Sequence, residues 1–419
     1  MELSQAARKV LEKARSEGGA TCFSSAPGRA DFLNTHQDYK MLPVVPVAIE
    51  KRTFVACSKL DKPGVVRVKS LTLEREGVES EDVFKSEEVE LMEGKWFGNY
   101  FRSIHMLFSK RYGVLKTGLA IYVDSEVPVA SGLASSAALH VSLAAMYAKL
   151  LGLSLSKMEL AEIAYEAEHN IMRIPCGRLD QYASSYGGII KLDFKPTISV
   201  EEFDGSGLIF VIADSGVRHS TAEIHPARQS ELDTAVKMLR ESNISESLRR
   251  MLEGNHASVE WRLLEEDVLG NCLSTLPKKL ANRIIFTLRM QRSTEVALEI
   301  LKYRTANKAS LERLGLKHTE DWSEALGEIV NMQHILLRDY YDVSHPKLEE
   351  MRNAALEAGA LGVKISGAGM GGSLLALVKT PEDASAVEKA FADAGASSVF
   401  KTGVGEGASA SILSGGKHA

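Results

Sequence analysis

Two glycine-rich segments contain the residue types that can bind phosphate groups. In residues 128–138, Gly132 stands just before a helix-forming run, and Ser135 and Ser136 fall in the predicted first turn. Glycine lets backbone N–H groups approach a bulky anion closely, and the start of a helix attracts negative charge. The pattern fits a phosphate cradle with a serine hydroxyl available to Mg²⁺, but also an ordinary helix start that is capped by serine.

The second segment, residues 366–373, contains the pattern G-x-G-x-x-G between two apolar runs. A dinucleotide site needs a strand before this pattern and a helix after it, whereas residues 373–378 are predicted to form a strand. The H-R-D and D-F-G motifs of protein kinases do not occur in the chain, so that class is excluded. The segment is predicted to be either part of a ligand site or a tight turn among small residues.

Two further segments contain polar residues that could bind hydroxyl groups or transfer protons. Residues 26–39 bring together Arg29, His36 and Asp38, which suits a hydroxyl-rich ligand; the alternative interpretation is a surface salt-bridge cluster. Residues 168–181 contain acids, of which one could act as a general base and another could hold a metal. Isolated acids are usually only solvated, so this segment is informative mainly in combination with the others.

Strand and helix patterns follow one another in mixed order along the chain. Apolar, β-branched runs predict strands, and apolar residues at helical spacing predict helices. The predicted strands are 44–55, 65–71, 120–124, 187–194 and 207–213, and the predicted helices are 1–19, 134–151, 157–173 and 381–395, with a mostly helical region at 226–341. This order predicts an α+β fold in two lobes, and a Gly/Asp/Ser cluster at 204–207 places the boundary between residues 1–205 and 206–419.

Composition and charge restrict the partners and the location. The chain has 419 residues and a net charge of -5, so a nucleic-acid partner and a polybasic membrane patch are not expected. Residues 127–148 carry no Asp, Glu, Lys or Arg, but Pro128 and Gly132 favour a buried loop and helix over a membrane span. The four cysteines form no C-x-x-C pair, so a zinc site or a thioredoxin-like active site is not indicated. Their small number and wide spacing fit a protein of the reducing cytoplasm.

Taken together, these segments resemble the motifs of the GHMP small-molecule kinases and, within them, of the galactokinases. Residues 28–39 resemble the galactokinase motif G-R-V-N-L-I-G-E-H-T-D-Y, residues 132–138 resemble G-L-S-S-S-A-A, and residues 367–372 resemble G-G-G-F-G-G. The sequences A-E-H and P-C-G-x-x-D-Q are retained within 167–181, and further matches lie at 217–220, 337–339 and 343–344. The resemblance covers most of the chain. It implies the two-lobed GHMP kinase fold with the active site in the cleft between the lobes.

The resemblance also implies a reaction, which is ATP-dependent phosphorylation of the anomeric hydroxyl of a hexose. Asp180 would accept the proton of that hydroxyl, and Arg29 would keep Asp180 ionised because an adjacent guanidinium lowers a carboxylate's pKa. Ser136 and Glu168 would hold Mg²⁺, which bridges the β- and γ-phosphates of ATP. Alignment and charge stabilisation are most of what phosphoryl transfer requires, so this small set of residues would suffice.

The remaining site residues implied by the resemblance fall into three groups. The nucleotide phosphates would contact Gly132, Leu133, Ala134, Ser135, Ser136 and Ala137, with Trp96 near the nucleotide. The third glycine motif would brace this loop and the sugar pocket through Gly367, Gly369, Gly371 and Gly372. The substrate would contact Thr35, His36, Asp38, Gly177, Arg178 and His225. The only partner implied is a small-molecule sugar, and the sequence carries no indication of an oligomeric state.

Three positions depart from the galactokinase pattern, and all three concern the sugar. Thr35 replaces a Glu that points at the sugar's 6-hydroxyl, His225 replaces a Tyr, and Arg178 replaces a common Ile. Loss of an anion and gain of cations would suit an acidic group at C6. Galactose nevertheless remains the expected substrate, because Asp38 and the rest of the pocket are kept, with galacturonate or another C6-modified sugar as the alternative.

Two other readings of the function concern different protein classes. Some galactokinase relatives bind ATP and sugar as non-catalytic regulators, but these typically lose the phosphate loop or the base, whereas Ser136, Glu168 and Asp180 are present here. The second alternative is a branch of the superfamily that phosphorylates mevalonate or homoserine. The pairs Asp38-Tyr39 and Asp180-Gln181 favour the sugar kinases instead.

Overall fold

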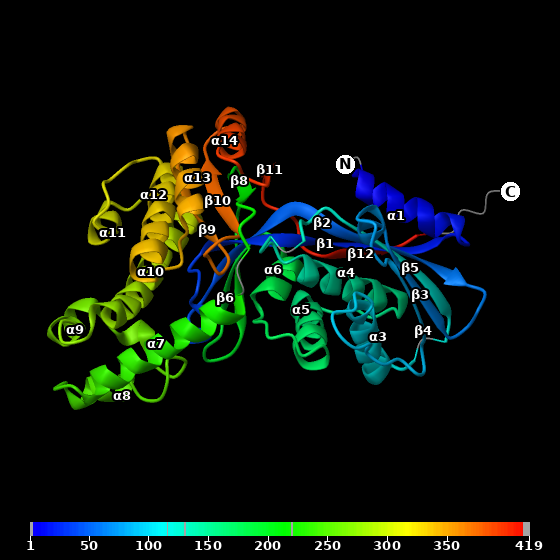
Figure 1. Cartoon of the computed structure of the whole chain (residues 1–419), viewed down its shortest axis with the longest axis horizontal. Helices are drawn as coiled ribbons and strands as arrows, with labels where there is room; N and C mark the ends of the chain where they lie inside the picture. The colour runs from blue at the N-terminus through cyan, green and yellow to red at the C-terminus, as the bar shows by residue number, and fades with distance from the viewer. Residues whose placement is uncertain (1–2, 115, 130, 219–220, 414–419) are drawn as a thin grey trace. The chain divides into compact units, whose positions relative to one another are not determined.

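The chain folds into a mixed α+β structure, as predicted. The computed structural model describes residues 3–114, 116–129, 131–218 and 221–413 (Figure 1). Contacts divide it into two compact units. Unit 1 holds the described residues of 1–29, 48–188 and 405–419, and unit 2 holds 30–47 and the described residues of 189–404.

The two units interleave along the sequence. Two long strands, β1 (Ala20–Leu33) and β2 (Val45–Leu60), each run from one unit into the other. The units therefore each contain segments from both sides of residue 205, the position of the single boundary that the sequence indicates. The lobe boundary at that residue stays a prediction.

Unit 1 is built on a sheet with the strand order β12-β1-β2-β5-β3-β4. Its other strands are β3 (Val65–Ser70), β4 (Glu81–Lys85), β5 (Gly118–Ser125) and β12 (Ser409–Ile412). β3 and β5 pair in parallel, whereas β12–β1, β2–β5 and β3–β4 pair antiparallel. The sheet extends into unit 2, where β6 (Ile189–Asp193) pairs with β2 and with β7 (Ser199–Phe203).

Helices cover both faces of the unit 1 sheet. Figure 1 shows α1 on one side and α3, α4 and α5 on the other. The alternation of side chains along a strand explains this arrangement, because Phe54 and Ala56 share a core with α1, whereas Val55 and Cys57 share a core with α3 and α4. The helices are α1 (Gln5–Ser16), α2 (Leu71–Arg75), α3 (Asn99–Tyr112), α4 (Ser135–Leu150), α5 (Lys157–Glu166) and α6 (Leu179–Tyr186).

Helix α4 is the uncharged stretch that a hydropathy scan would single out. It is buried on most of its surface between the sheet and its neighbouring helices, which explains why the sequence shows no polar face. Within the residues that the structure describes, no helix is long and apolar enough to cross a bilayer. The predicted buried helix is therefore confirmed, whereas the loop before it is exposed at Val129 and Gly132.

Unit 2 contains a four-stranded antiparallel sheet in the order β11-β8-β10-β9. Its strands are β8 (Ile209–Asp214), β9 (Gly362–Ser366), β10 (Ser373–Val378) and β11 (Ser398–Thr402). Alternate residues of β10, Leu374, Ala376 and Val378, lie in one core with α13 (Pro346–Glu357) and α14 (Pro381–Asp393). The other α-helices of unit 2 are α7 (Thr221–Glu241), α8 (Glu246–Met251), α9 (Glu266–Leu273), α10 (Lys278–Tyr303), α11 (Lys308–Arg313) and α12 (Trp322–Ile335). Residues of α7, α8, α9 and α10 form a second hydrophobic core.

Candidate functional site

In unit 1, three segments that are far apart in the sequence meet at Arg29. The Nε and Nη2 atoms of Arg29, on β1, donate to Oδ1 of Asp180 at 3.0 and 2.7 Å. Its Nη1 donates to the carbonyl of Gly132, and its backbone N–H donates to the carbonyl of Leu133 at 3.1 Å. The Arg29 side chain is 9% exposed and that of Asp180 is 29% exposed. The guanidinium is thus enclosed, while the carboxylate that it orients stays accessible.

The turn held by Arg29 leads directly into helix α4. Gly132 has a φ of 76°, and Ala134 occupies the N-cap position in the left-handed region at φ 59° and ψ 42°. The N-cap residue Ala134 makes no side-chain cap, and Ser135 and Ser136 lie inside the first turn. The alternative interpretation of a serine cap is therefore wrong. An uncapped first turn offers backbone N–H groups to an anion. Ala130, within the same predicted segment, lies outside the described residues.

Glu168 lies in a π-helical turn, Ala167–Ile171, that follows α5. Its carboxylate is almost fully buried and accepts a hydrogen bond from Gln181 Nε2 at 2.8 Å, with His140 Nδ1 3.5 Å away. Burial acts to raise the pKa of Glu168, but contacts with His140, Ser136 and Gln181 outweigh it and lower the pKa below its ordinary value. The side chain is therefore a carboxylate at neutral pH.

The pairing of Glu168 with Ser136 fits a hard divalent cation. A carboxylate and a hydroxyl are oxygen ligands of the kind that Mg²⁺ prefers, and Mg²⁺ is commonly held by one or two protein groups with phosphates and water completing its shell. Among the described residues, no group of three or more His, Cys, Asp and Glu side chains could hold a metal by itself. The residues present therefore fit Mg²⁺ bound together with a nucleotide, not a closed structural metal site.

The other predicted residues of unit 1 lie in different surroundings. Arg178 donates from Nε to Glu162 Oε1 at 2.8 Å and stacks 4.0 Å above the ring of Tyr165, while Gly177 is exposed. Trp96 is half-buried with its ring centroid 4.8 Å from that of Phe97. The Nε1 atom of Trp96 is buried and has no hydrogen-bond partner within the described residues.

The predicted sugar-facing residues Thr35, His36 and Asp38 lie in unit 2, just after β1. Thr35 Oγ1 accepts a hydrogen bond from Lys364 Nζ at 2.7 Å, and His36 Nε2 donates to the carbonyl of Ala368 at 3.0 Å. The ring of His225, from α7, lies 5.0 Å from that of His36. Burial raises the pKa of Asp38, against the opposing effect of His225.

The third glycine motif connects β9 and β10 in a tight turn. Gly367 N–H donates to Asp31 Oδ2 at 3.1 Å, and Met370 N–H donates to the carbonyl of Val343 at 2.7 Å. Gly367, Gly369, Gly371 and Gly372 all have positive φ values. The glycine motif is followed by strand β10, as predicted, and not by the helix that a dinucleotide site requires. The motif instead holds the end of β1 and, through Ala368, His36.

The tightest position of this turn is Gly369, with a φ of 85° and Val343 O 2.3 Å from where a Cβ would lie. Gly372, with a φ of 70°, has no atom within 4 Å of that position. We expect Gly372→Ala to cost about 1–2 kcal/mol of folding free energy through its backbone alone. Gly369→Ala should cost roughly 1–3 kcal/mol more through overpacking. Denaturant unfolding of both variants measures the difference, and equal losses would contradict the contact with Val343.

Lys364, on β9, is fully buried beneath Thr35. Its Nζ donates to Thr35 Oγ1 at 2.7 Å and to the carbonyls of Asp31 and Ile365 at 2.9 Å each. Burial lowers the pKa of Lys364 to about 8, although Asp31 acts in the opposite direction. The amine is thus mainly an ammonium at neutral pH, and its three N–H groups match its three acceptors.

This pKa predicts a pH dependence of stability. An unfolded lysine titrates near 10.4, so between pH 8 and about 10 the unfolded chain binds more protons at Lys364 than the folded chain does. The destabilising effect of the buried charge is full below pH 8 and fades as the pH rises. We expect the unfolding free energy of the wild type to rise relative to Lys364→Met over this range. Parallel pH profiles of the two proteins would contradict the assigned pKa.

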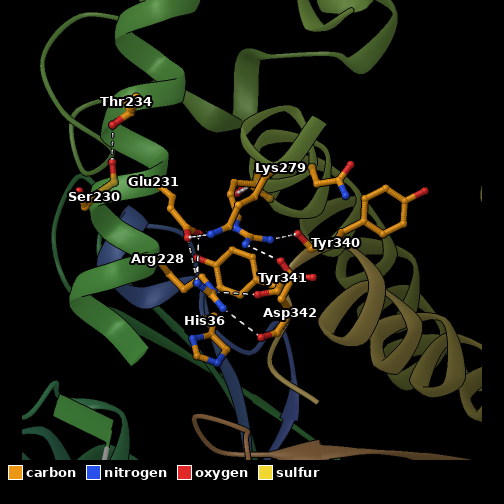
Figure 2. A network of polar contacts seen from close by, with 12 residues as sticks. His36, Arg228, Ser230, Glu231, Thr234, Lys279, Tyr340, Tyr341 and Asp342 are labelled. Atoms are coloured by element: carbon orange, nitrogen blue, oxygen red, sulfur yellow. Dashed lines mark hydrogen bonds and ion pairs between the residues drawn. The ribbon is translucent and has the colours of Figure 1, made fainter. Parts of the chain in front are cut away.

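A network of charged side chains ties helix α7 to residues 341–342, which precede α13. Figure 2 shows Arg228 and Glu231 pointing toward Tyr341 and Asp342. Arg228 donates to the carbonyls of Tyr341 and Asp342 at 2.7 and 2.9 Å and to Glu231 at 3.1 Å. Arg283, from α10, is 0% exposed and contacts Glu231 and Asp342 at 2.6 Å each. Val343, which accepts from Met370 of the glycine turn, follows this segment directly.

The sequence prediction missed the supporting residues Lys364, His140 and Arg283. Lys364 stands two residues before the segment 366–373, so the sequence could have indicated that it lies near the site. Its contact with Thr35, however, depends on tertiary structure. His140 lies in the uncharged stretch, where a lone histidine gives no signal. The predicted match at 217–220 is only partly described, because His219 and Ser220 lie outside the described residues.

Comparison with known proteins places this geometry in context. The family model "GHMP kinases N terminal domain" matches residues 99–188, "GHMP kinases C terminal" matches 314–397, and "Galactokinase galactose-binding signature" matches 13–59. The galactokinase of Chloroflexus aurantiacus is 28% identical over 368 residues, which cover 85% of this chain and 84% of that protein. The galactokinase of Thermococcus kodakarensis is 28% identical over 84% of this chain and 88% of its own length.

Solved structures of the same kind share the fold. The structure of Lactococcus lactis galactokinase complexed with galactose matches with a TM-score of 0.74 at 22% identity, covering 96% of this chain and 99% of that one. Methanococcus jannaschii mevalonate kinase matches with a TM-score of 0.65 at 16% identity, covering 92% of this chain and 99% of the other. At these identities the structural matches establish the architecture alone.

Proposed function

We propose, from the premise that this chain belongs to the GHMP kinases and within them to the galactokinase family, that it transfers the γ-phosphoryl group of ATP to the anomeric hydroxyl of galactose. The predicted GHMP kinase fold is confirmed, and the chain is a galactokinase-like, ATP-dependent sugar kinase. The observation that best supports the roles of individual residues is the contact of Arg29 with both Asp180 and the carbonyl of Gly132. It joins a proton acceptor to the turn expected to bind phosphate.

The proposed reaction uses few groups. Asp180, oriented by Arg29, accepts the proton of the attacking sugar hydroxyl, and the positive charge of Arg29 offsets charge that develops on the transferred phosphoryl group. Backbone N–H groups of the uncapped α4 start, from Gly132 to Ala137, bind the nucleotide phosphates. Ser136 and Glu168 would hold Mg²⁺, which supplies charge neutralisation to those phosphates when bound. Trp96 contacts the nucleotide.

The sugar is bound by residues of the matched galactose-binding signature and by three others. Asp38 and His36 bind its hydroxyl groups, with Thr35 between the anchored residues Asn34 and His36. Gly177, Arg178 and His225 complete the proposed substrate contacts. The third glycine motif holds this segment, since Ala368 accepts from His36 and Gly367 donates to Asp31.

A coupled assay of ADP release tests this function. We expect ADP release to depend on both ATP and galactose, and to be undetectable with mevalonate or homoserine in place of the sugar. Asp180→Asn protein that is expressed and purified in the same way controls for contaminating kinases. Galactose binding without ADP release would instead favour a non-catalytic regulator, and turnover of mevalonate would contradict the sugar-kinase assignment.

A further inference from the structure

The hydroxyl of Thr35 is restricted to donating toward a ligand. Its oxygen already accepts a hydrogen bond from Lys364, whose three N–H groups are used on Thr35, Asp31 and Ile365. Within the part of the chain that the structure describes, Thr35 Oγ1 takes part in no other hydrogen bond. A hydroxyl that accepts from an ammonium has its own proton left to give. A ligand group that meets Thr35 is therefore best matched if it is an acceptor.

The backbone around Thr35 is fixed on both sides, so the hydroxyl cannot easily turn away. Asn34 has a φ of 61° and donates to Gln291 Oε1 at 2.9 Å, and His36 has a φ of 64° and is anchored on Ala368. Thr35 is 4% exposed and lies within the matched galactose-binding signature, residues 13–59. Its donor is thus a preorganised part of the sugar-binding segment.

The group that donates to Thr35 from behind is the ammonium of Lys364. The three acceptors of Lys364 are two backbone carbonyls and a hydroxyl, so no carboxylate takes a hydrogen bond from it. Asp31, whose Oδ2 accepts from Gly367, also acts on Lys364 as an opposite charge. In a region of low dielectric, a buried cation favours a nearby anion strongly. A negative ligand group on Thr35 would gain both a hydrogen bond and this attraction.

We propose that Thr35 and Lys364 select a sugar whose group facing Thr35 is a carboxylate, that is, a hexuronic acid of the galactose configuration. This inference rests on the proposed function. A hexose that keeps its ring and its free anomeric hydroxyl can carry a carboxylate only at C6, so the substrate class is a 6-carboxylate such as galacturonate. The 6-hydroxyl of galactose can also accept from Thr35, but it gains nothing from the charge of Lys364.

The test compares kcat/KM for galacturonate, galactose and 6-deoxygalactose with ATP under identical conditions. We expect galacturonate to be at least comparable with galactose, and 6-deoxygalactose, which lacks an acceptor, to be the poorest of the three. A preference for galactose over galacturonate of more than about tenfold, roughly 1.4 kcal/mol, overturns the inference and leaves the proposed function intact. Failure to phosphorylate any of these sugars overturns the proposed function itself.

Two substitutions separate the effect of the hydroxyl from that of the charge. Thr35→Glu places a carboxylate beside the site, and we expect it to shift the galacturonate-to-galactose ratio of kcat/KM by at least 100-fold toward galactose. Thr35→Val keeps the shape but removes both the donor and the oxygen that accepts from Lys364 Nζ, and we expect a shift in the same direction of about tenfold. Because Thr35→Val conserves volume, it remains informative if Thr35→Glu does not fold. An unchanged ratio in a folded variant contradicts the role assigned to Thr35.

Discussion

Asp180→Asn is expected to lower kcat for sugar phosphorylation by about 10²–10⁴-fold, the usual contribution of a general base. The amide has the shape of the carboxylate and its oxygen can still accept from Arg29, but it cannot take up the proton of the sugar hydroxyl. Because Asp180 is partly exposed at the start of α6, the fold should tolerate the change. Initial-rate kinetics and thermal unfolding of the same preparation measure both effects.

Asp204→Asn provides a matched control. Asp204 lies in a surface turn with its side chain 68% exposed and 3.3 Å from Arg304, so it makes an ion pair with arginine but has no proposed part in the reaction. We expect Asp204→Asn to keep wild-type kcat. A near-normal kcat in Asp180→Asn would show that Asp180 is not the proton acceptor, whatever its position beside Arg29.

The second large effect is expected on stability, for Glu231→Gln. Glu231 forms ion pairs with Arg228 and Lys279 (Figure 2). It also pairs with Arg283. Arg283 is fully buried, and removal of one partner of a buried ion pair usually costs about 3–5 kcal/mol because the remaining charge is left uncompensated. Asp342 still pairs with Arg283, so we expect Glu231→Gln to lose unfolding free energy near the lower end of that range, about 3 kcal/mol, in denaturant titrations.

Glu246→Gln is the corresponding control on the surface. Glu246 is 70% exposed, lies 3.6–3.8 Å from Arg249 and Arg250, and should cost about 0–1 kcal/mol when neutralised, as exposed ion pairs do. Similar losses in the two variants would contradict the assignment of Glu231 as the compensating charge. Because the network fixes the carbonyls of Tyr341 and Asp342 next to Val343, the Glu231 variant should also loosen the glycine turn.

Some elements were predictable because their patterns depend on local sequence. The predicted helix at 134–151 corresponds to α4, and the strand predicted at 373–378 is β10. Strand β1 was missed because residues 20–33 mix Ser, Gly, Pro, Arg and Asp with apolar residues, and its burial comes from neighbours distant in sequence. Helix α3 was missed although Phe101, Ile104, Leu107 and Phe108 have helical spacing.

The motif residues of the site were identified from sequence, but the groups that hold them were not. The approach of Arg29, Gly132 and Asp180 was expected from the family resemblance, and the structure brings these residues together. Lys364 and Arg283 look like ordinary surface cations in the sequence, since only tertiary packing buries them. Ser135 and Ser136 fitted a helix cap equally well until the structure placed Ala134 at the N-cap.

If Asp180 accepts the proton of the anomeric hydroxyl, the product carries its new phosphate on C1 and its formation depends on Asp180. Phosphorus NMR of the product formed from ATP and galactose labelled with carbon-13 at C1 tests it most directly. We predict a new phosphate resonance split by coupling to the labelled carbon, formed by the wild type and not detectably by Asp180→Asn over the same time. A phosphate ester without that coupling, or equal product from both proteins, would contradict the claim.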